Sequence, residues 1–173
     1  ANEVVPGFLD ILERVAENRL ITEDEKSAVF LIIHILGELG EKNAYRPLMK
    51  ILEIDRLTLD EVFGDAITGT IHKIIVNIFD GKTDPLYRVI RNPDADEFAR
   101  DAAFRAWTYL ADRGDIDKDE AERFLADCYE SLQPQARHYI WSSWLDALAV
   151  LRYDRLMPLA KNAFEKGFPP PSS

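Results

Sequence analysis

The chain lacks most of the features that would staple it, anchor it in a membrane or bind it to nucleic acid. Its one cysteine, Cys128, cannot form an intramolecular disulfide, which favours a reducing cytoplasm. The longest uninterrupted apolar run covers residues 28–33, and no signal-peptide pattern is present. With 31 acidic and 21 basic residues, the net charge of −10 argues against phosphate binding. We therefore expect a cytoplasmic protein with no nucleic-acid and no membrane partner.

Strand patterns are nearly absent, and helix patterns fill the chain. Thr22 and Glu25 form the sequence of a capping box at one helix start, and Gly40 is placed to end that helix. Thr58 is the expected cap of another helix. Short connections imply antiparallel neighbours. We predict nine helices, at residues 6–18, 23–39, 43–54, 59–79, 84–91, 95–113, 117–131, 134–152 and 153–166.

An apolar stripe returns about every 38 residues. Its first members are Phe8, Leu48, Leu86, Phe124 and Leu159, which are 40, 38, 38 and 35 positions apart. A period near 40 with two helices per unit is typical of helical solenoids. The expected fold is all-α, an α-α superhelix (a HEAT-like solenoid) of about nine helices in antiparallel hairpins. We expect one domain over residues 1–167 and, at 168–173, a disordered tail or the cut end of a longer protein.

The segment 59–79 carries the clearest candidate for a functional surface. Gly64 and Gly69 predict a kink or a close helix contact within it. Its core side is predicted to hold Val62, Phe63, Ala66, Ile67, Ile71, Ile74 and Ile78. The opposite side carries Glu61, Asp65, Thr68 and His72, whose spacing of 4, 3 and 4 forms one helical stripe.

Equivalent positions of the neighbouring repeats extend this stripe. A shift of 38 residues backward gives Ser27 and His34, and a shift of 36 forward gives Asp101 and Thr108, with Arg105 beside them. Equivalent positions in a solenoid line one concave surface, so we predict a shared groove. The alternatives are a solvated face whose polar groups pair with one another, and, for His34, a satisfied core histidine. A metal site is disfavoured because stacked helices lie about 8–10 Å apart.

The aromatic C-terminal part adds one more candidate. Trp144 shares a stripe with apolar residues and is predicted to be core, whereas Trp141 lies off that stripe and could be an exposed anchor for a partner. Cys128 falls on an apolar stripe and is expected to be packed rather than reactive. No catalytic motif, metal motif or cofactor motif is present.

Two stretches carry a family resemblance. LGELGEKNAYRPLMKILE, followed by LTLDEVFGDAITGTIHKII, resembles the bacterial family named domain of unknown function 1186, and NPDADEFARDAAFRAWTYLADRGDI continues the match. The resemblance covers essentially the whole chain and implies a HEAT-type helical repeat. The family has no assigned activity. Gly69 stands where the family pattern leads us to expect an acidic residue.

These observations support three hypotheses of function. The favoured one is a scaffold that binds a protein or peptide in its groove, without catalysis. The second is an enzyme, or a protein that binds a small ligand or metal, with His72 and Asp65 at its centre. The third is a structural domain whose function lies in a C-terminal extension.

Overall fold

All regular structure is helical in the residues that the computed structural model describes, which are 3–17, 19 and 22–171. Eleven α-helices and two short 3-10 helices occur there, rather than the predicted nine helices. The elements are α1 (Val5–Ala16), α2 (Glu23–Leu39), η1 (Lys42–Ala44), α3 (Tyr45–Ile51), α4 (Arg56–Phe63), α5 (Ala66–Gly69), α6 (Ile71–Ile78), α7 (Asp84–Arg91), α8 (Glu97–Arg113), α9 (Lys118–Ser131), α10 (Ile140–Leu151), η2 (Asp154–Leu156) and α11 (Met157–Glu165).

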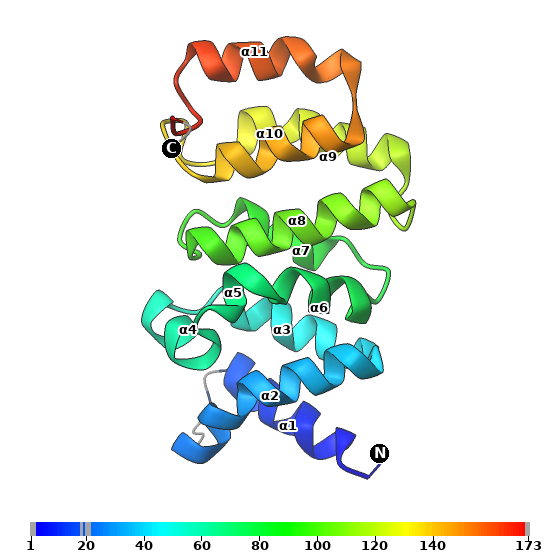
Figure 1. Cartoon of the computed structure of the whole chain (residues 1–173), viewed down its shortest axis with the longest axis vertical. Coiled ribbons are helices and arrows are strands. Elements are labelled where there is room, and N and C mark those ends of the chain that lie inside the picture. The colour runs from blue at the N-terminus through cyan, green and yellow to red at the C-terminus, as the bar shows by residue number, and fades with distance from the viewer. Residues whose placement is uncertain (1–2, 18, 20–21, 172–173) are drawn as a thin grey trace.

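The helices are stacked along the long axis of the molecule, from α1 and α2 at one end to α11 at the other (Figure 1). A front row is formed by α2, α6, α8 and α10, each of which contacts the next. Behind it, α1 contacts α3 and α3 contacts α7. The front row carries seven of the ten residues that the sequence predicts for a groove, and the other three, Glu61, Asp65 and Thr68, lie on or beside α4 and α5.

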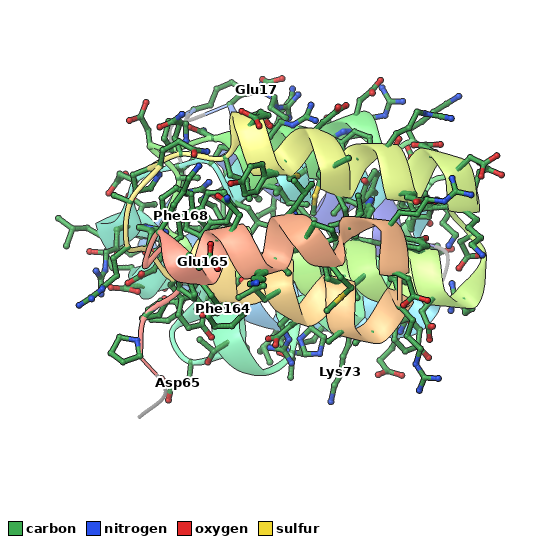
Figure 2. All side chains as sticks on the ribbon, turned by 90° about the horizontal axis from the view of Figure 1, so that it is seen from above. Glu17, Asp65, Lys73, Phe164, Glu165 and Phe168 are labelled. Carbon is green, nitrogen blue, oxygen red and sulfur yellow. The ribbon has the colours of Figure 1, made fainter. Side chains whose placement is uncertain are left out.

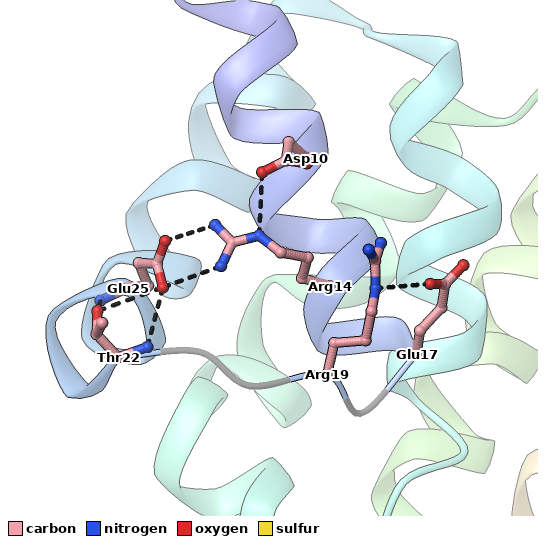
Figure 3. Close-up of polar contacts among 6 residues, drawn as sticks. All are labelled: Asp10, Arg14, Glu17, Arg19, Thr22 and Glu25. Atoms are coloured by element: carbon pink, nitrogen blue, oxygen red, sulfur yellow. Dashed lines mark hydrogen bonds and ion pairs between the residues drawn. The ribbon is translucent and has the colours of Figure 1, made fainter.

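The start of α2 is fixed by its predicted capping box. The Thr22 side chain accepts a hydrogen bond from the Glu25 backbone N–H, and the Glu25 carboxylate accepts one from the Thr22 N–H. The same carboxylate binds the Arg14 guanidinium of α1, which also donates to Asp10 (Figure 3). These hydrogen bonds lower the pKa of Glu25 to about 2, and the one from Arg14 has the largest effect. One ion cluster therefore joins α1 to α2.

Helix ends follow the sequence at several points. Gly40 ends α2 and Gly114 ends α8, both with a left-handed backbone (φ 63° and 86°) that favours glycine. The cap of α4 differs from the prediction: it is Asp55, whose carboxylate accepts from the Thr58 N–H. Aspartate is as good an N-cap residue as threonine, so the helix begins three residues earlier than predicted and Thr58 lies within its first turn.

The predicted helix at 59–79 is broken into α4, α5 and α6. Gly64 adopts φ 47° and ψ −134°, which no α-helix contains, so the kink expected here is a full interruption. A second interruption follows at Thr70, directly after Gly69. All seven residues predicted for the core side are nonetheless buried. The break therefore leaves the apolar side of the segment buried.

Two boundaries near the C-terminus differ from the prediction. The helix expected from residue 134 begins at Ile140, because residues 132–139 form a loop in which the Gln135 side chain donates to the carbonyls of Tyr129 and Leu132 at the end of α9. Phe168, predicted as the start of a tail, is buried, and its ring centroid lies 4.7 Å from that of Trp141. The packed structure thus extends past the predicted boundary at 167.

The recurring apolar stripe forms the core. Leu48, Leu86 and Phe124 are at most 3% exposed, as are their stripe partners on α3, α7 and α9. Cys128 is completely buried within this stripe, and burial raises its pKa to about 12, as expected for a packed thiol. The pattern also predicts that Phe164, five residues after Leu159, belongs to this stripe; this is wrong, since Phe164 is 62% exposed on the last helix of the stack.

Candidate functional site

Four of the ten predicted groove residues line one hollow of about 570 Å³: His72, Asp101, Arg105 and Thr108. The hollow lies mainly between α8 and α10. From α8 come Asp101, Arg105, Thr108, Tyr109 and Asp112, and from α10 come Ser143, Asp146, Ala149 and Val150. On each helix these positions are spaced by three or four residues, or adjoin one another, so each set forms one stripe. Helical periodicity therefore builds both walls.

A second hollow of about 410 Å³ adjoins the first. It is lined by His72, Lys73, Val76, Asn77, Tyr109 and Arg113, from α6 and α8. His72 and Tyr109 belong to both hollows, so together they form one depression across three helices, which we call the α6–α10 groove. Lys73 lies on one edge of the molecule seen from above, on the opposite side from Glu17 of the back row (Figure 2).

Arg105 joins the layers beneath the groove. Its guanidinium donates to the Thr68 carbonyl at 2.9 Å and to His72 Nε2 at 3.2 Å. Its distance to the Asp101 carboxylate is 4.0 Å, the outer limit of an ion pair. Arg105 is therefore held mainly by α5 and α6 rather than by the acids of its own helix.

Asp101 is the most buried acid of the groove, at 8% exposure. Its Oδ1 accepts a hydrogen bond of 2.8 Å from the Ser143 hydroxyl, which joins α8 to α10. Burial raises the pKa of Asp101, although the Ser143 hydrogen bond and the Arg105 charge act in the opposite direction. The Asp101 carboxylate in the groove is thus less well stabilised in its charged form than it would be in water.

His72 is a half-buried, neutral side chain. Burial first, then the charges of Arg105 and Lys73, lower its pKa to about 4. Because Nε2 accepts from Arg105, the proton of the neutral ring lies on Nδ1. That atom is buried and has no hydrogen-bond partner among the described residues.

The groove is negatively charged at neutral pH. This holds for its larger hollow, which Asp101, Asp112 and Asp146 face from α8 and α10 against the guanidinium of Arg105, whereas the smaller hollow carries Lys73 and Arg113. Burial raises the pKa of Asp146 as well. Tyr139, just before α10, also has a raised pKa, and the Asp101 carboxylate is the main cause. A ligand that neutralises this negative potential would stabilise the site.

The N-terminal members of the predicted stripe lie outside the hollows. His34 is half-buried and uses both ring nitrogens: Nδ1 contacts the Phe30 carbonyl at 2.7 Å and Nε2 the Thr70 hydroxyl at 2.9 Å. This matches the alternative of a satisfied histidine, although on the surface rather than in the core. Glu61 forms an ion pair with Lys26.

The other three N-terminal members are exposed. Ser27 lies on α2, Asp65 just before α5 on the edge of the molecule that also bears Lys73 (Figure 2), and Thr68 within α5. The Thr68 hydroxyl donates to the Asp65 carbonyl, and the Thr68 carbonyl accepts from Arg105. The structure therefore brings the C-terminal members of the predicted stripe into one hollow and leaves the N-terminal members outside it.

Trp141 is not an exposed anchor, and the prediction is wrong on this point. Its side chain is fully buried, its Nε1–H donates to the Pro134 carbonyl at 3.0 Å, and its ring packs on Trp144 and Phe168. The loop at 132–139 and the chain end at Phe168 cover the side of α10 that the predicted longer helix would have left open.

Several groove residues were not predicted from the sequence. In the larger hollow they are Tyr109, Asp112, Tyr139, Ser143, Asp146, Ala149 and Val150, and in the smaller one also Lys73, Val76, Asn77 and Arg113. The α10 members were within reach: a further shift of 41 or 42 residues from Asp101, Arg105 and Thr108 gives Ser143, Asp146 and Ala149. This shift is longer than 38 because the loop at 132–139 intervenes.

The groove has few of the features of a catalytic or metal-binding site. Cys128 lies in the core rather than on this surface. Within the described part of the chain, no three His, Cys, Asp or Glu side chains are grouped so that they could hold a metal ion. Among the same residues no helix has the length and hydropathy to cross a membrane.

Comparison with known proteins gives one match. The family model described as "Protein of unknown function (DUF1186)" matches residues 1–169. No curated protein and no solved structure matches the chain. The resemblance drawn from the sequence is confirmed, and the chain belongs to the DUF1186 family.

Proposed function

We propose that this protein is a cytoplasmic, HEAT-like repeat scaffold that binds a protein or peptide segment in the α6–α10 groove and performs no chemistry of its own. The observation that carries the proposal is the groove itself: an open depression across three helices, lined by acids, hydroxyls and exposed aromatic rings. Grooves on helical repeats are common sites for extended partners.

Hydrogen bonds at a constant sequence separation support the repeat architecture. They join equivalent positions of consecutive helix pairs on both rows. The pairs are Lys26–Glu61, His34–Thr70, Tyr45–Lys82, Arg88–Glu53, Thr83–Glu120 and Tyr129–Asn162, which are 33 to 37 residues apart. Such regular contacts are expected when each unit contacts only its neighbours.

A small organic ligand is the second candidate. The larger hollow, at about 570 Å³, falls within the range of small-molecule sites. Small-molecule sites are usually more enclosed and more apolar than this one, in which three carboxylates line an open hollow. A peptide segment, which covers several helices at once, suits the two adjoining hollows better.

The first experiment locates the partner on the surface. A photo-reactive benzoylphenylalanine replaces Tyr109, which is 57% exposed in the groove, and in a control replaces Leu57, which is 75% exposed on α4. Cross-linking in lysate should give a product from position 109 that is absent at position 57, and mass spectrometry identifies the protein in it. Equal products at both positions would argue against the groove.

The second experiment measures the affinity of the identified, purified partner. Ala149→Trp fills the larger hollow from an exposed position on α10, and Ser131→Trp adds the same ring at the exposed end of α9. Ala149→Trp should weaken binding at least about tenfold and Ser131→Trp less than about twofold. Wild-type affinity in Ala149→Trp would refute binding in this groove. A small-molecule ligand would be recognised by thermal stabilisation of the wild type that Ala149→Trp abolishes.

A further inference from the structure

The larger hollow has an excess of negative charge that its own residues do not neutralise. Asp101, Asp112 and Asp146 line it together with one cation, Arg105. We infer that this hollow receives a positively charged side chain, lysine or arginine, of the bound segment, an inference that rests on the proposed function. Asp101 and Asp146 are the acids that bind it.

Arg105 leaves the acids of the hollow largely unpaired. Its guanidinium donates to the Thr68 carbonyl and to His72 Nε2, both in the neighbouring layer. The remaining contact, to Asp101 Oδ2, measures 4.0 Å and is not a hydrogen bond. Since His72 is neutral at pH 7, it adds no positive charge.

Asp101 provides the fixed half of the site. More than nine-tenths of the residue is buried, and Ser143 holds one carboxylate oxygen, Oδ1, at 2.8 Å. The other oxygen, Oδ2, forms no hydrogen bond with the residues that the structure describes. Oδ2 is not itself buried but opens onto the hollow, so a cationic donor entering the hollow would form a charge-assisted hydrogen bond with it.

The ionisation of the neighbouring groups agrees with this geometry. Burial raises the pKa values of Asp101 and Asp146, and the Asp101 charge raises that of Tyr139. The shifts of the two aspartates come mainly from burial, and only that of Tyr139 comes mainly from a neighbouring negative charge. A bound ammonium or guanidinium group would lower each of these pKa values.

The walls suit the apolar stem and the charged head of such a side chain. Tyr109 and Tyr139 are 57% and 39% exposed, and aromatic rings attract cations over their faces. The Tyr109 ring already has the Arg113 guanidinium 5.6 Å from its centroid. Val150, which is 49% exposed, provides apolar surface for the methylene stem. An anionic ligand would meet three carboxylates and is disfavoured.

The test uses fluorescein-labelled peptides that repeat Gly-Ser-Lys, Gly-Ser-Arg, Gly-Ser-Gln or Gly-Ser-Glu, with fluorescence polarisation as readout. The variants are Asp101→Asn, Asp146→Asn and, as a matched control, Asp127→Asn on the exposed side of α9. Each changes the net charge equally, and an asparagine at position 101 can still accept from Ser143. Melting temperatures near that of the wild type would establish that the variants are folded.

We expect the lysine or the arginine peptide to bind, and the neutral and acidic peptides not to bind. Asp101→Asn and Asp146→Asn should each raise the Kd about 5- to 10-fold, and Asp127→Asn less than about twofold. The difference should remain at about 150 mM salt, where exposed charges are screened. Whichever cationic peptide binds more tightly identifies the preferred side chain.

Equal effects of the three substitutions would overturn the inference, because they would show general attraction to an acidic protein. Failure of both cationic peptides to bind at about 1 mM would also overturn it. The Ala149→Trp experiment separates the two proposals. If Ala149→Trp blocks the identified partner while the asparagine variants bind it normally, the groove is the binding site and the cationic anchor is wrong. If Ala149→Trp has no effect, the groove itself is wrong.

Discussion

His34 and His72 lie 38 residues apart at matching positions of α2 and α6, but their surroundings differ. At His34, the Phe30 carbonyl and the Thr70 hydroxyl engage both ring nitrogens, and the ring packs 4.4 Å from that of Phe30. At His72, only Nε2 has a hydrogen-bond partner among the described residues, and the ring forms part of two hollows. Sequence register therefore places equivalent side chains on one face without deciding which of them remain available to a ligand.

The side chains between the front-row helices supply the physical reason. A Cβ atom at Gly37 of α2 would lie 3.0 Å from Ile74 Cγ2 of α6, so these two helices meet closely. Between α8 and α10, by contrast, the side chains of Asp112, Asp146 and Val150 surround an unfilled hollow. The N-terminal half of the polar stripe is closed by its own pairings, and the C-terminal half is open.

The largest effect is expected from forcing the closed half apart. Gly37→Val places a branched side chain against Ile74, and overpacking of this kind costs about 2 kcal/mol of unfolding free energy. Urea denaturation followed by circular dichroism measures the change. Ile74→Ala should relieve the clash, so the double variant should lose less stability than the sum of the two single variants.

Gly7→Val is the matched control, because a Cβ atom at Gly7 of α1 would meet nothing within 4 Å among the described residues. It should leave stability unchanged within about 0.5 kcal/mol. If Gly37→Val were as stable as Gly7→Val, the close contact between α2 and α6 would not be what closes the N-terminal half.

A smaller effect is expected from protonating His72 in the open half. Its folded-state pKa of about 4 lies below the ordinary 6.5, so the unfolded chain binds the proton first as the pH falls. Stability from this residue is complete above about pH 6.5 and is lost between pH 6.5 and 4. The full shift corresponds to about 3 kcal/mol, which solvent screening at a half-buried ring reduces to roughly 1–2 kcal/mol.

His72→Gln isolates this contribution, since its amide oxygen can still accept from Arg105 and it does not titrate. The difference in unfolding free energy between wild type and His72→Gln should change across this pH window, while the contributions of Asp101 and the other acids cancel. A constant difference from pH 7 to 4 would contradict the assigned environment of His72.

Much of the front row was predictable because it depends on local patterns. The capping box at Thr22, the end of α2 at Gly40 and the buried side of 59–79 follow from short-range chemistry, and all three are confirmed. The fixed register also brought His72 and Asp101 to one surface. These features need only helical period and repeat length.

The remaining features depend on tertiary structure. Trp141 lies off the apolar stripe of its helix, but Phe168 and the loop at 132–139 bury it, and neither contact has a local pattern. The interruption at Gly64 was foreseen only as a kink, because one glycine can bend or end a helix. The depth of the groove is set by side chains of different helices, which no single-helix pattern describes.

The smallest effect is expected from freeing an acidic side chain in the closed half, where no hollow surrounds it. Lys26→Met releases Glu61, which is then an unpaired carboxylate on an exposed part of α4. Exposed ion pairs contribute little to stability, so the melting temperature should change by less than about 2 °C. The affinity for the lysine and arginine peptides should also remain within about twofold of wild type, although the variant is one unit more negative. The contrary result would be a gain in peptide affinity for Lys26→Met that is as large as the loss for Asp101→Asn. In that case any free carboxylate on this face would bind the peptides, and the hollow between α8 and α10 would not be what distinguishes the open half.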